Sequence, residues 1–322
     1  LFGQCGGCQF QQWDYAAQLR WKHAQVKKLF EAIAPGVDVN SVIASPRTYG
    51  YRSKITPHFE PPRVGDAPVI GFLRHNSRTR YVDVEKCPIA MEEINAALPA
   101  ARAGITDTIA TFKRGSTLLM RVAEGRVFTN HKDIITETVG DSLRLKFPAG
   151  GFFQNNPFLL PQFAAYAVGE ARKGGATFLV DAYCGSGLFA LSAAPFFRKV
   201  VGVELSEASV VQARENAQLN NVAHASFVLG DAARIFDGLA LPPMETAVII
   251  DPPRKGCDEN FLAQLVQFAP VTIVYISCNP HTQARDLEPL LRAGYRVNAI
   301  QPFDLFPQTK HLECVVTLCV VR

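Results

Sequence analysis

In the first half of the chain, hydrophobic and polar positions follow one pattern up to residue 36 and another over residues 41–150. Apolar residues recur at helical spacing from Tyr15 to Ile33, and the breaker Ala34-Pro35-Gly36 ends that pattern. Residues 41–150 instead contain short β-rich runs between turn residues, with one helical pattern near 88–103. The sequence therefore predicts an N-terminal helix followed by a small α+β lobe.

From about residue 158 the pattern alternates between short apolar strands and helices. Strands are expected at 177–182, 199–204, 225–229, 246–251, 271–277, 295–300 and 313–321. This alternation is typical of an α/β domain with a doubly wound, largely parallel sheet. We therefore expect three units, which are a Cys-rich knuckle with its helix at 1–40, the α+β lobe at 41–150, and the α/β domain at 151–322.

Composition and charge narrow the class of protein. The 322 residues are 48% hydrophobic and 19% charged, which excludes extended disorder, coiled coil and collagen. No apolar run approaches the roughly 18 residues of a membrane span. Residues 1–150 hold 20 Lys and Arg against 14 Asp and Glu, whereas residues 151–322 hold 13 against 15. A polyanion bound by the first half would explain this asymmetry, and an ordinary basic surface is the alternative.

Eight cysteines are placed irregularly, at positions 5, 8, 87, 184, 257, 278, 314 and 319. No secretory signal is visible, so free thiols, metal ligation or catalysis are favoured over a disulfide framework. The first residue is Leu1 rather than Met, and we expect the chain to begin inside a longer gene product.

A nucleotide-type loop follows the first strand of the α/β domain. Gly185 and Gly187 allow a sharp turn and a close approach of the backbone to a ligand. Together with Ala190 they also satisfy the dinucleotide pattern, so NAD stays open at this point. Glu204 ends the second strand, where its carboxylate suits ribose hydroxyls, and Asp231 follows the third strand, in reach of an adenine edge.

Three further strand ends carry candidate chemistry. Asp251-Pro-Pro is common in S-adenosyl-methionine enzymes that act on nucleobases, although two prolines also simply stop a strand. Cys278 follows the strand at 272–277 and is a candidate nucleophile, with a buried apolar thiol as the alternative. Glu313 enters an apolar strand, where an acid is costly unless it is paired or functional. It is a candidate base, and His311 is equally titratable.

Four ordered motifs together resemble those of the RNA uridine-5-methyltransferases. They are Tyr183-Cys-Gly-Ser-Gly187, Asp251-Pro-Pro-Arg-Lys-Gly256, Ser277-Cys-Asn-Pro280 and His311-Leu-Glu313. The resemblance covers nearly the whole chain. It is greatest to the fungal branch that methylates the T-loop uridine of tRNA, and bacterial ribosomal-RNA members are also similar. The resemblance implies a Rossmann-like domain that binds S-adenosyl-L-methionine, with a smaller RNA-binding lobe.

The resemblance also implies roles for individual residues. Cofactor-binding positions fall on Gln154, Tyr183, Glu204 and Asp251, the nucleophile on Cys278 and the base on Glu313. The thiolate of Cys278 would add to C6 of uracil, and Glu313 would remove the C5 proton after methyl transfer. Two other classes stay open, a Rossmann dehydrogenase with bound nicotinamide and a non-catalytic RNA-binding protein.

By the same resemblance, Cys5, Cys8 and Cys87 look like three ligands of a 4Fe-4S cluster. We expect the family's first cluster cysteine to lie before Leu1, and zinc or unliganded thiols are the alternatives. The implied partner is RNA, with no protein partner and no membrane, and we expect a monomer. The implied location is intracellular, in the cytoplasm, with the nucleus and the mitochondrion as alternatives.

Overall fold

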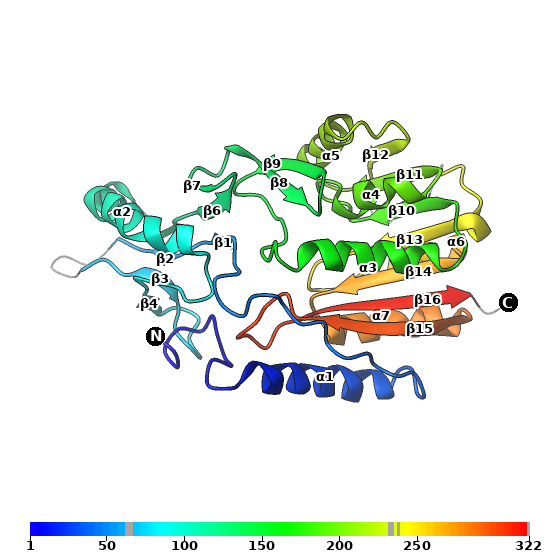
Figure 1. The fold of residues 1–322 in the computed structure, drawn as a ribbon, viewed down its shortest axis with the longest axis horizontal. Coiled ribbons are helices and arrows are strands. Elements are labelled where there is room, and N and C mark those ends of the chain that lie inside the picture. Colours follow the sequence, from blue (N-terminus) through cyan, green and yellow to red (C-terminus); the bar gives the residue numbers. More distant parts are fainter. Residues whose placement is uncertain (62–66, 231–234, 237–238, 321–322) are drawn as a thin grey trace.

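The computed structural model describes residues 1–61, 67–230, 235–236 and 239–320. A seven-stranded sheet with helices on both faces forms one part of the molecule, and a lobe of smaller sheets lies beside it (Figure 1). The lobe lies next to the edge of the large sheet where its parallel strands end.

The large sheet has the order β12-β11-β10-β13-β14-β16-β15. Neighbouring strands from β12 to β14 are parallel, and β16 is antiparallel to both β14 and β15. The predicted α/β fold with a largely parallel, doubly wound sheet is therefore confirmed. The strands are β10 (Phe178–Ala182), β11 (Lys199–Glu204), β12 (Ala225–Leu229), β13 (Thr246–Ile250), β14 (Thr272–Ser277), β15 (Tyr295–Phe303) and β16 (Glu313–Val320).

Helices bury the two faces of this sheet because side chains alternate between the faces along each strand. Leu179 of β10 packs with α3 (Leu160–Arg172), α4 (Leu188–Ala193) and α5 (Glu207–Leu219). Val180, the next residue, packs with α1 (Tyr15–Glu31), α6 (Glu259–Phe268) and α7 (Pro280–Arg292). Across the described ranges, each helix falls short of the length and apolarity that crossing a membrane requires.

The lobe is built from short strands around α2 (Glu92–Thr108). One sheet has the order β4-β3-β2-β5 and another the order β1-β6-β7. The predicted helix near 88–103 is displaced, because residues 88–90 instead bond with the chain at Gly50 and Arg52. The strands are β1 (Lys54–Ile55), β2 (His58–Phe59), β3 (Ile70–Leu73), β4 (Tyr81–Asp83), β5 (Ser116–Thr117), β6 (Met120–Ala123) and β7 (Arg126–Phe128).

A hairpin of β8 (Ile134–Val139) and β9 (Leu143–Pro148) connects the lobe with the sheet. Ile135, Leu145 and Phe147 of this hairpin are buried in the same core as α3 and α4. Short 3-10 helices occupy Ile109–Thr111, Ala194–Phe196 and Pro243–Glu245. The division of the chain at residues 40 and 150 stays a prediction, and packing crosses both of those positions.

Helix α1 is fastened to the sheet by a buried ion pair. Lys22 Nζ lies 2.6 Å from Asp304 Oδ1 and also donates to the carbonyl oxygen of Phe306 at 3.1 Å. Both charged side chains are fully buried. Burial alone would lower the pKa of Lys22, and Asp304 opposes that change by stabilising the charged ammonium. The pair therefore fixes the 304–312 segment, which leads into β16.

Substituting Lys22→Met should destabilise the fold strongly, because it leaves the carboxylate of Asp304 buried without its cation. We expect a loss of about 3–5 kcal/mol in the free energy of unfolding, measured by urea denaturation. The exposed Lys27 of the same helix provides the control, since Lys27→Met should change stability by no more than about 0.5 kcal/mol. Equal stability of the two variants would show that the pair contributes nothing.

Candidate active site

The carboxyl ends of the parallel strands open into a cavity of about 1640 Å³. Its walls combine the turns after β10, β11, β13 and β14 with the 151–155 segment and with β1 of the lobe. Ligands of open α/β sheets bind at this edge. The predicted residues Gln154, Tyr183, Glu204, Asp251 and Cys278 all line the cavity, as do Gly185 and Glu313. Asp231 lies outside the described residues, so its predicted role is not placed.

The glycine turn after β10 is built from left-handed backbone. Tyr183, Gly185 and Gly187 have φ angles of 64°, 53° and 95°. A Cβ at Gly187 would lie 3.2 Å from a methyl carbon of Leu191, so the turn packs tightly against α4. A Cβ at Gly185 would meet no atom within 4 Å. The space beside Gly185 therefore belongs to the cavity, and the backbone is accessible to a ligand there.

Glu204 is held in a fixed orientation at the end of β11. Its Oε2 accepts a hydrogen bond from the Gly185 N–H at 3.0 Å, and its Oε1 accepts one from the Ser206 N–H at 2.9 Å. Each carboxylate oxygen keeps a second lone pair for a ligand. The two features predicted from sequence, the glycine turn and the acid 19 residues later, are thus in direct contact.

Sheet register brings the candidate nucleophile and the candidate base together. Ser277 of β14 is paired with Cys314 of β16 in the antiparallel ladder. The next residues outward, Cys278 and Glu313, therefore lie opposite each other at the rim of the cavity. Burial raises the pKa of the Cys278 thiol to about 11, with Glu313 adding to the rise and Arg254 opposing it. The side chains of all three are thus close enough to influence one another electrostatically.

Glu313 is a buried carboxyl group with free hydrogen-bonding capacity. It is 3% exposed, and its Oε2 has no hydrogen-bond partner among the described residues. Burial raises its pKa well above the usual value, and the neighbouring Asp251 adds to this, while Arg254 opposes it. An unpartnered carboxyl facing a cavity has the character of a functional group rather than of a structural one.

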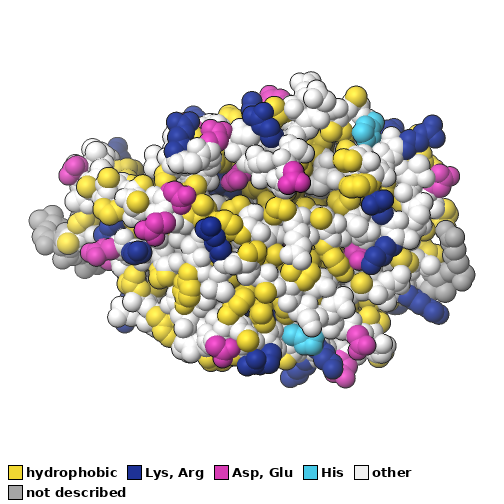
Figure 2. Space-filling model, in the orientation of Figure 1, with side chains coloured by type: hydrophobic (Ala, Val, Ile, Leu, Met, Phe, Trp, Pro, Cys, Tyr) yellow, Lys and Arg dark blue, Asp and Glu magenta, His cyan; other side chains and the backbone are white. Residues whose placement is uncertain are grey.

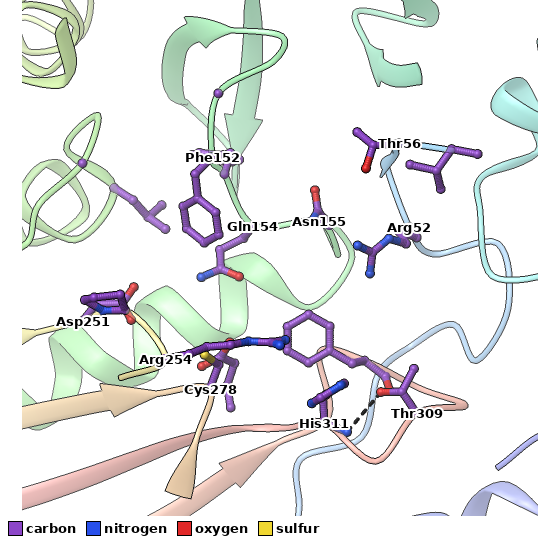
Figure 3. Close-up of a pocket in the computed structure, with 18 of the residues that line it drawn as sticks. Arg52, Thr56, Phe152, Gln154, Asn155, Asp251, Arg254, Cys278, Thr309 and His311 are labelled. Atoms are coloured by element: carbon purple, nitrogen blue, oxygen red, sulfur yellow. Dashed lines mark hydrogen bonds between the residues drawn. The ribbon is translucent and has the colours of Figure 1, made fainter. Parts of the chain in front are cut away.

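His311, the alternative base, lies in the same cavity but is a weaker proton acceptor. Burial, followed by the positive charge of Arg254, lowers its pKa to about 4. Its backbone N–H donates to the hydroxyl of Thr309, as the dashed line in Figure 3 shows. The ring is therefore neutral at neutral pH, and Glu313 is the better candidate for proton removal.

Arg254 is a cavity residue that the sequence pattern did not single out. Its backbone oxygen accepts hydrogen bonds from Asn279 Nδ2 at 3.1 Å and from the hydroxyl of Thr282 at 3.2 Å. These bonds hold the Asp251-Pro-Pro-Arg254 turn against the start of α7. The side chain of Arg254 lies beside Cys278 in Figure 3, with Gln154 and Phe152 above it. Its place directly after the double proline is the signal that could have identified it.

Two further cavity residues come from outside the predicted set. Phe152 is 83% exposed and lies two residues before Gln154, which is 7% exposed. Arg52, from the segment before β1, lies across the cavity from Asp251 in Figure 3. Arg52 contributes to the basic excess of residues 1–150, which a bound polyanion would explain. On the face shown in Figure 2, acidic and basic side chains are interspersed.

The three predicted cluster ligands, Cys5, Cys8 and Cys87, lie along the same cavity. The pKa of Cys8 is raised to about 12 by burial and then by the neighbouring Cys87 and Cys5. The Gly6 N–H donates to the carbonyl oxygen of Leu73, so the knuckle is docked on the end of β3. Among the described residues, no three His, Cys, Asp or Glu side chains form a group that could hold a metal ion. The arrangement of these thiols therefore does not fit a complete metal site.

The remaining cysteines have the environment of ordinary core thiols. Cys184, Cys257 and Cys314 are buried, and Cys319 is partly buried near the far end of β16. Of these, Cys184 lines the cavity through the glycine turn.

Comparison with known proteins gives consistent matches. The family described as tRNA (uracil-5-)-methyltransferase matches residues 105–321. A tRNA (uracil(54)-C(5))-methyltransferase of Schizosaccharomyces pombe is 44% identical over 99% of this chain and 65% of its own length. The Saccharomyces cerevisiae protein of that name is 33% identical over 100% of this chain and 61% of its own length. The chain thus spans less than two thirds of these fungal relatives.

Two further matches extend the comparison. An uncharacterized RNA methyltransferase of Gloeobacter violaceus is 33% identical, with 98% of this chain aligned to 80% of that protein. Among solved structures, a Pyrococcus abyssi tRNA (uracil-54, C5)-methyltransferase in complex with S-adenosyl-L-homocysteine superimposes with a TM-score of 0.77. The match covers 97% of this chain and 85% of that one at 24% identity, which shows a shared fold.

Proposed function

The chain belongs to the tRNA (uracil-5-)-methyltransferase family, and we propose that it methylates C5 of a uridine in RNA, the T-loop uridine of tRNA. The observation that carries this proposal is the facing of Cys278 and Glu313 across the β14–β16 ladder, in a cavity that Asp251 and Glu204 also line. The two fungal relatives named for uracil-54 support tRNA over ribosomal RNA as the substrate.

The residues around the glycine turn fit S-adenosyl-L-methionine. This cofactor supplies the methyl group when it is bound. The carboxylate of Glu204, oriented by the N–H groups of Gly185 and Ser206, suits the two ribose hydroxyls. The open space beside Gly185 admits the nucleoside, and Gln154 and Asp251 border the route from there to Cys278. The complex of the Pyrococcus abyssi protein with S-adenosyl-L-homocysteine supports this assignment.

Cys278 supplies the nucleophile that uracil chemistry requires. C5 of uracil is too weak a nucleophile to attack a methyl sulfonium unaided, so a thiolate must first add to C6. The new S–C6 bond places the electron pair at C5, which then takes the methyl group. Burial raises the pKa of the Cys278 thiol. The positive charge of Arg254 beside it opposes this effect and favours the thiolate.

Glu313 completes the reaction by removing the proton from C5. The electrons of the C5–H bond then form the C5–C6 double bond, and the S–C6 bond breaks to release the Cys278 thiolate. A buried carboxylate is a stronger base than an exposed one because burial favours its protonated form. The base and the nucleophile lie on the same rim of the cavity. The base receives the only proton that the product must lose.

The substrate uridine must leave its base stack to reach Cys278, since C6 is inaccessible in a stacked loop. Arg52 on the lobe side of the cavity and Arg254 on the sheet side are placed to bind phosphates or the uracil edge. Arg47, stacked 3.9 Å over the ring of Phe158, extends this basic surface. A tRNA substrate implies action inside the cell, and we retain the cytoplasm as the proposed compartment and the monomer as the proposed state.

The substrate proposal is tested by methylating total RNA with labelled S-adenosyl-L-methionine and mapping the labelled nucleotide. We expect label at C5 of the T-loop uridine of tRNA. Label confined to large ribosomal RNA would replace the proposed substrate with the ribosomal alternative. Binding of nicotinamide without methyl transfer would favour the dehydrogenase class instead.

We retain the 4Fe-4S cluster only as a proposal that needs at least one ligand besides Cys5, Cys8 and Cys87. It rests on the family resemblance of these three positions, which all line the cavity but do not form a metal-binding group among the described residues. Iron and sulfide analysis of anaerobically purified protein would decide between a cluster, zinc and free thiols. No step of the reaction above depends on the outcome.

A further inference from the structure

Two cations of the lobe bind three consecutive carbonyl groups of the segment that leads to Gln154. Lys54 Nζ donates to the carbonyl oxygens of Gly150 at 3.0 Å and Gly151 at 2.9 Å. Arg121 Nη1 donates to those of Ala149 at 3.2 Å and Gly151 at 3.0 Å. Three successive carbonyl oxygens thus accept hydrogen bonds from two cationic groups, and hydrogen bonds from charged donors are stronger than neutral ones.

Sheet register places the two cations side by side. Lys54 of β1 and Arg121 of β6 are directly paired residues of one antiparallel ladder. Like charges in that position repel each other, so each needs a compensating group. Among the described residues these carbonyl oxygens accept all the hydrogen bonds that the two side chains donate. The β1–β6 ladder therefore provides a binding site for the 149–151 turn.

The side chain of Arg121 is buried far more deeply than that of a surface arginine. Its side chain is fully buried, and its Nε and Nη2 atoms have no hydrogen-bond partner in the described structure. The guanidinium lies 4.8 Å from the ring centre of Phe147, which lines the cavity. Glu137 is the nearby acid, and burial raises its pKa to about 7, so its compensation is incomplete. Keeping such a cation buried is costly, which indicates that the turn it holds matters.

The same segment is held further along its length. The Ser53 N–H, next to Lys54, donates to the carbonyl oxygen of Asn155 at 2.9 Å. Asn156 Nδ2 donates to the carbonyl oxygen of Leu305 at 3.2 Å. Phe152 and Gln154 lie between the anchored 149–151 carbonyl groups and the anchor at Asn155, and the side chain of Gln154 makes no hydrogen bond among the described residues. With no hydrogen bond of its own, the side chain of Gln154 relies on the backbone anchors on either side of it for its position.

We propose that Lys54 and Arg121 are positioning residues, which clamp the 149–151 turn so that Gln154 is held in place for the cofactor. The assignment of Gln154 to the cofactor rests on the proposed function. The clamp also connects the two parts of the molecule, because Arg52 and Thr56 of the same lobe segment line the cavity. Loss of the clamp should loosen the segment without removing any group that contacts a ligand.

The experiment compares Lys54→Met with Lys54→Arg, which keeps the charge, and with Lys113→Met, an exposed lysine of the same lobe. Affinity for S-adenosyl-L-homocysteine is measured by calorimetry on the full chain. We expect Lys54→Met to raise the dissociation constant about tenfold, the effect of losing one charged hydrogen-bonding group. Lys54→Arg should restore affinity to within about twofold, and Lys113→Met should match the unsubstituted protein. Arg121→Lys provides a second, charge-conserving test, with a smaller loss expected.

Hydrogen exchange of residues 149–156, measured without any ligand, separates the clamp from the proposed function. We expect faster exchange in Lys54→Met, recovery in Lys54→Arg and no change in Lys113→Met. Unchanged exchange and unchanged affinity in Lys54→Met would overturn the clamp, as would equal impairment in Lys54→Arg. If the unsubstituted protein binds no S-adenosyl-L-homocysteine, the proposed function fails, and the exchange result still decides whether the clamp exists.

Discussion

Cys278→Ala should abolish methyl transfer to RNA, with a fall in turnover of about 10⁴-fold or more, as expected when a covalent nucleophile is removed. The reason is that C5 of uracil receives no electron pair unless a thiolate adds to C6. Transfer of labelled methyl groups to purified tRNA provides the measurement. Binding of S-adenosyl-L-homocysteine should persist, because Glu204 and the glycine turn are unaltered.

Cys319→Ala is the matched control for this loss. Cys319 of β16 is paired with Thr272, at the end of β14 opposite to the end that Cys278 follows, and it does not line the cavity. The control should keep full turnover. A Cys278→Ala variant that retains full activity would exclude the covalent route and would leave a non-catalytic RNA-binding role open for this residue.

Glu313→Gln should separate the two halves of the reaction. The variant still forms the S–C6 bond and accepts the methyl group, but it lacks the base that removes the C5 proton. We expect turnover to fall by about 10²–10⁴-fold, the range for loss of a general base. A protein–RNA complex that carries the labelled methyl group should accumulate and survive a denaturing gel.

The controls for this prediction use a distant acid and the competing base. Glu288 on the exposed side of α7 is the matched acid, and Glu288→Gln should release product at the normal rate. The double variant Cys278→Ala, Glu313→Gln should form no complex. If Glu313→Gln turns over normally while His311→Ala accumulates the complex, His311 is the base and the assignment of Glu313 is wrong.

The elements of this fold were predictable from local sequence patterns, because the spacing of apolar residues in each element reflects which of its residues are buried. The spacing of apolar residues after Tyr15 predicts α1, and the run before Cys278 predicts β14, with the thiol at its carboxyl end. The acid at the start of β16 is visible as an exception to an apolar strand. These features depend only on neighbouring residues, so sequence was sufficient to find them.

Features that depend on strand order were not predictable in the same way. The insertion of β16 between β14 and β15 is what places Glu313 opposite Cys278, and neither strand encodes its neighbour in its own pattern. The ion pair of Lys22 and Asp304 joins residues 282 positions apart. Arg254 was overlooked although it directly follows the double proline, because its proximity to Cys278 and Glu313 depends on the packing of strands that are distant in sequence.

The position of β16 also has a consequence for how the sheet is completed during synthesis. A ribosome releases β14 and Cys278 well before it releases the residues of β16, yet β16 lies between β14 and β15 in the finished sheet. The seven-stranded sheet therefore cannot close during synthesis until the chain has been made through Val320. Cys278 and Glu313 come together only when β16 is inserted. A chain interrupted before β16 would leave Cys278 without the carboxyl group of Glu313 opposite it, so under the proposed function a nascent chain would gain the ability to modify RNA only when β16 is inserted.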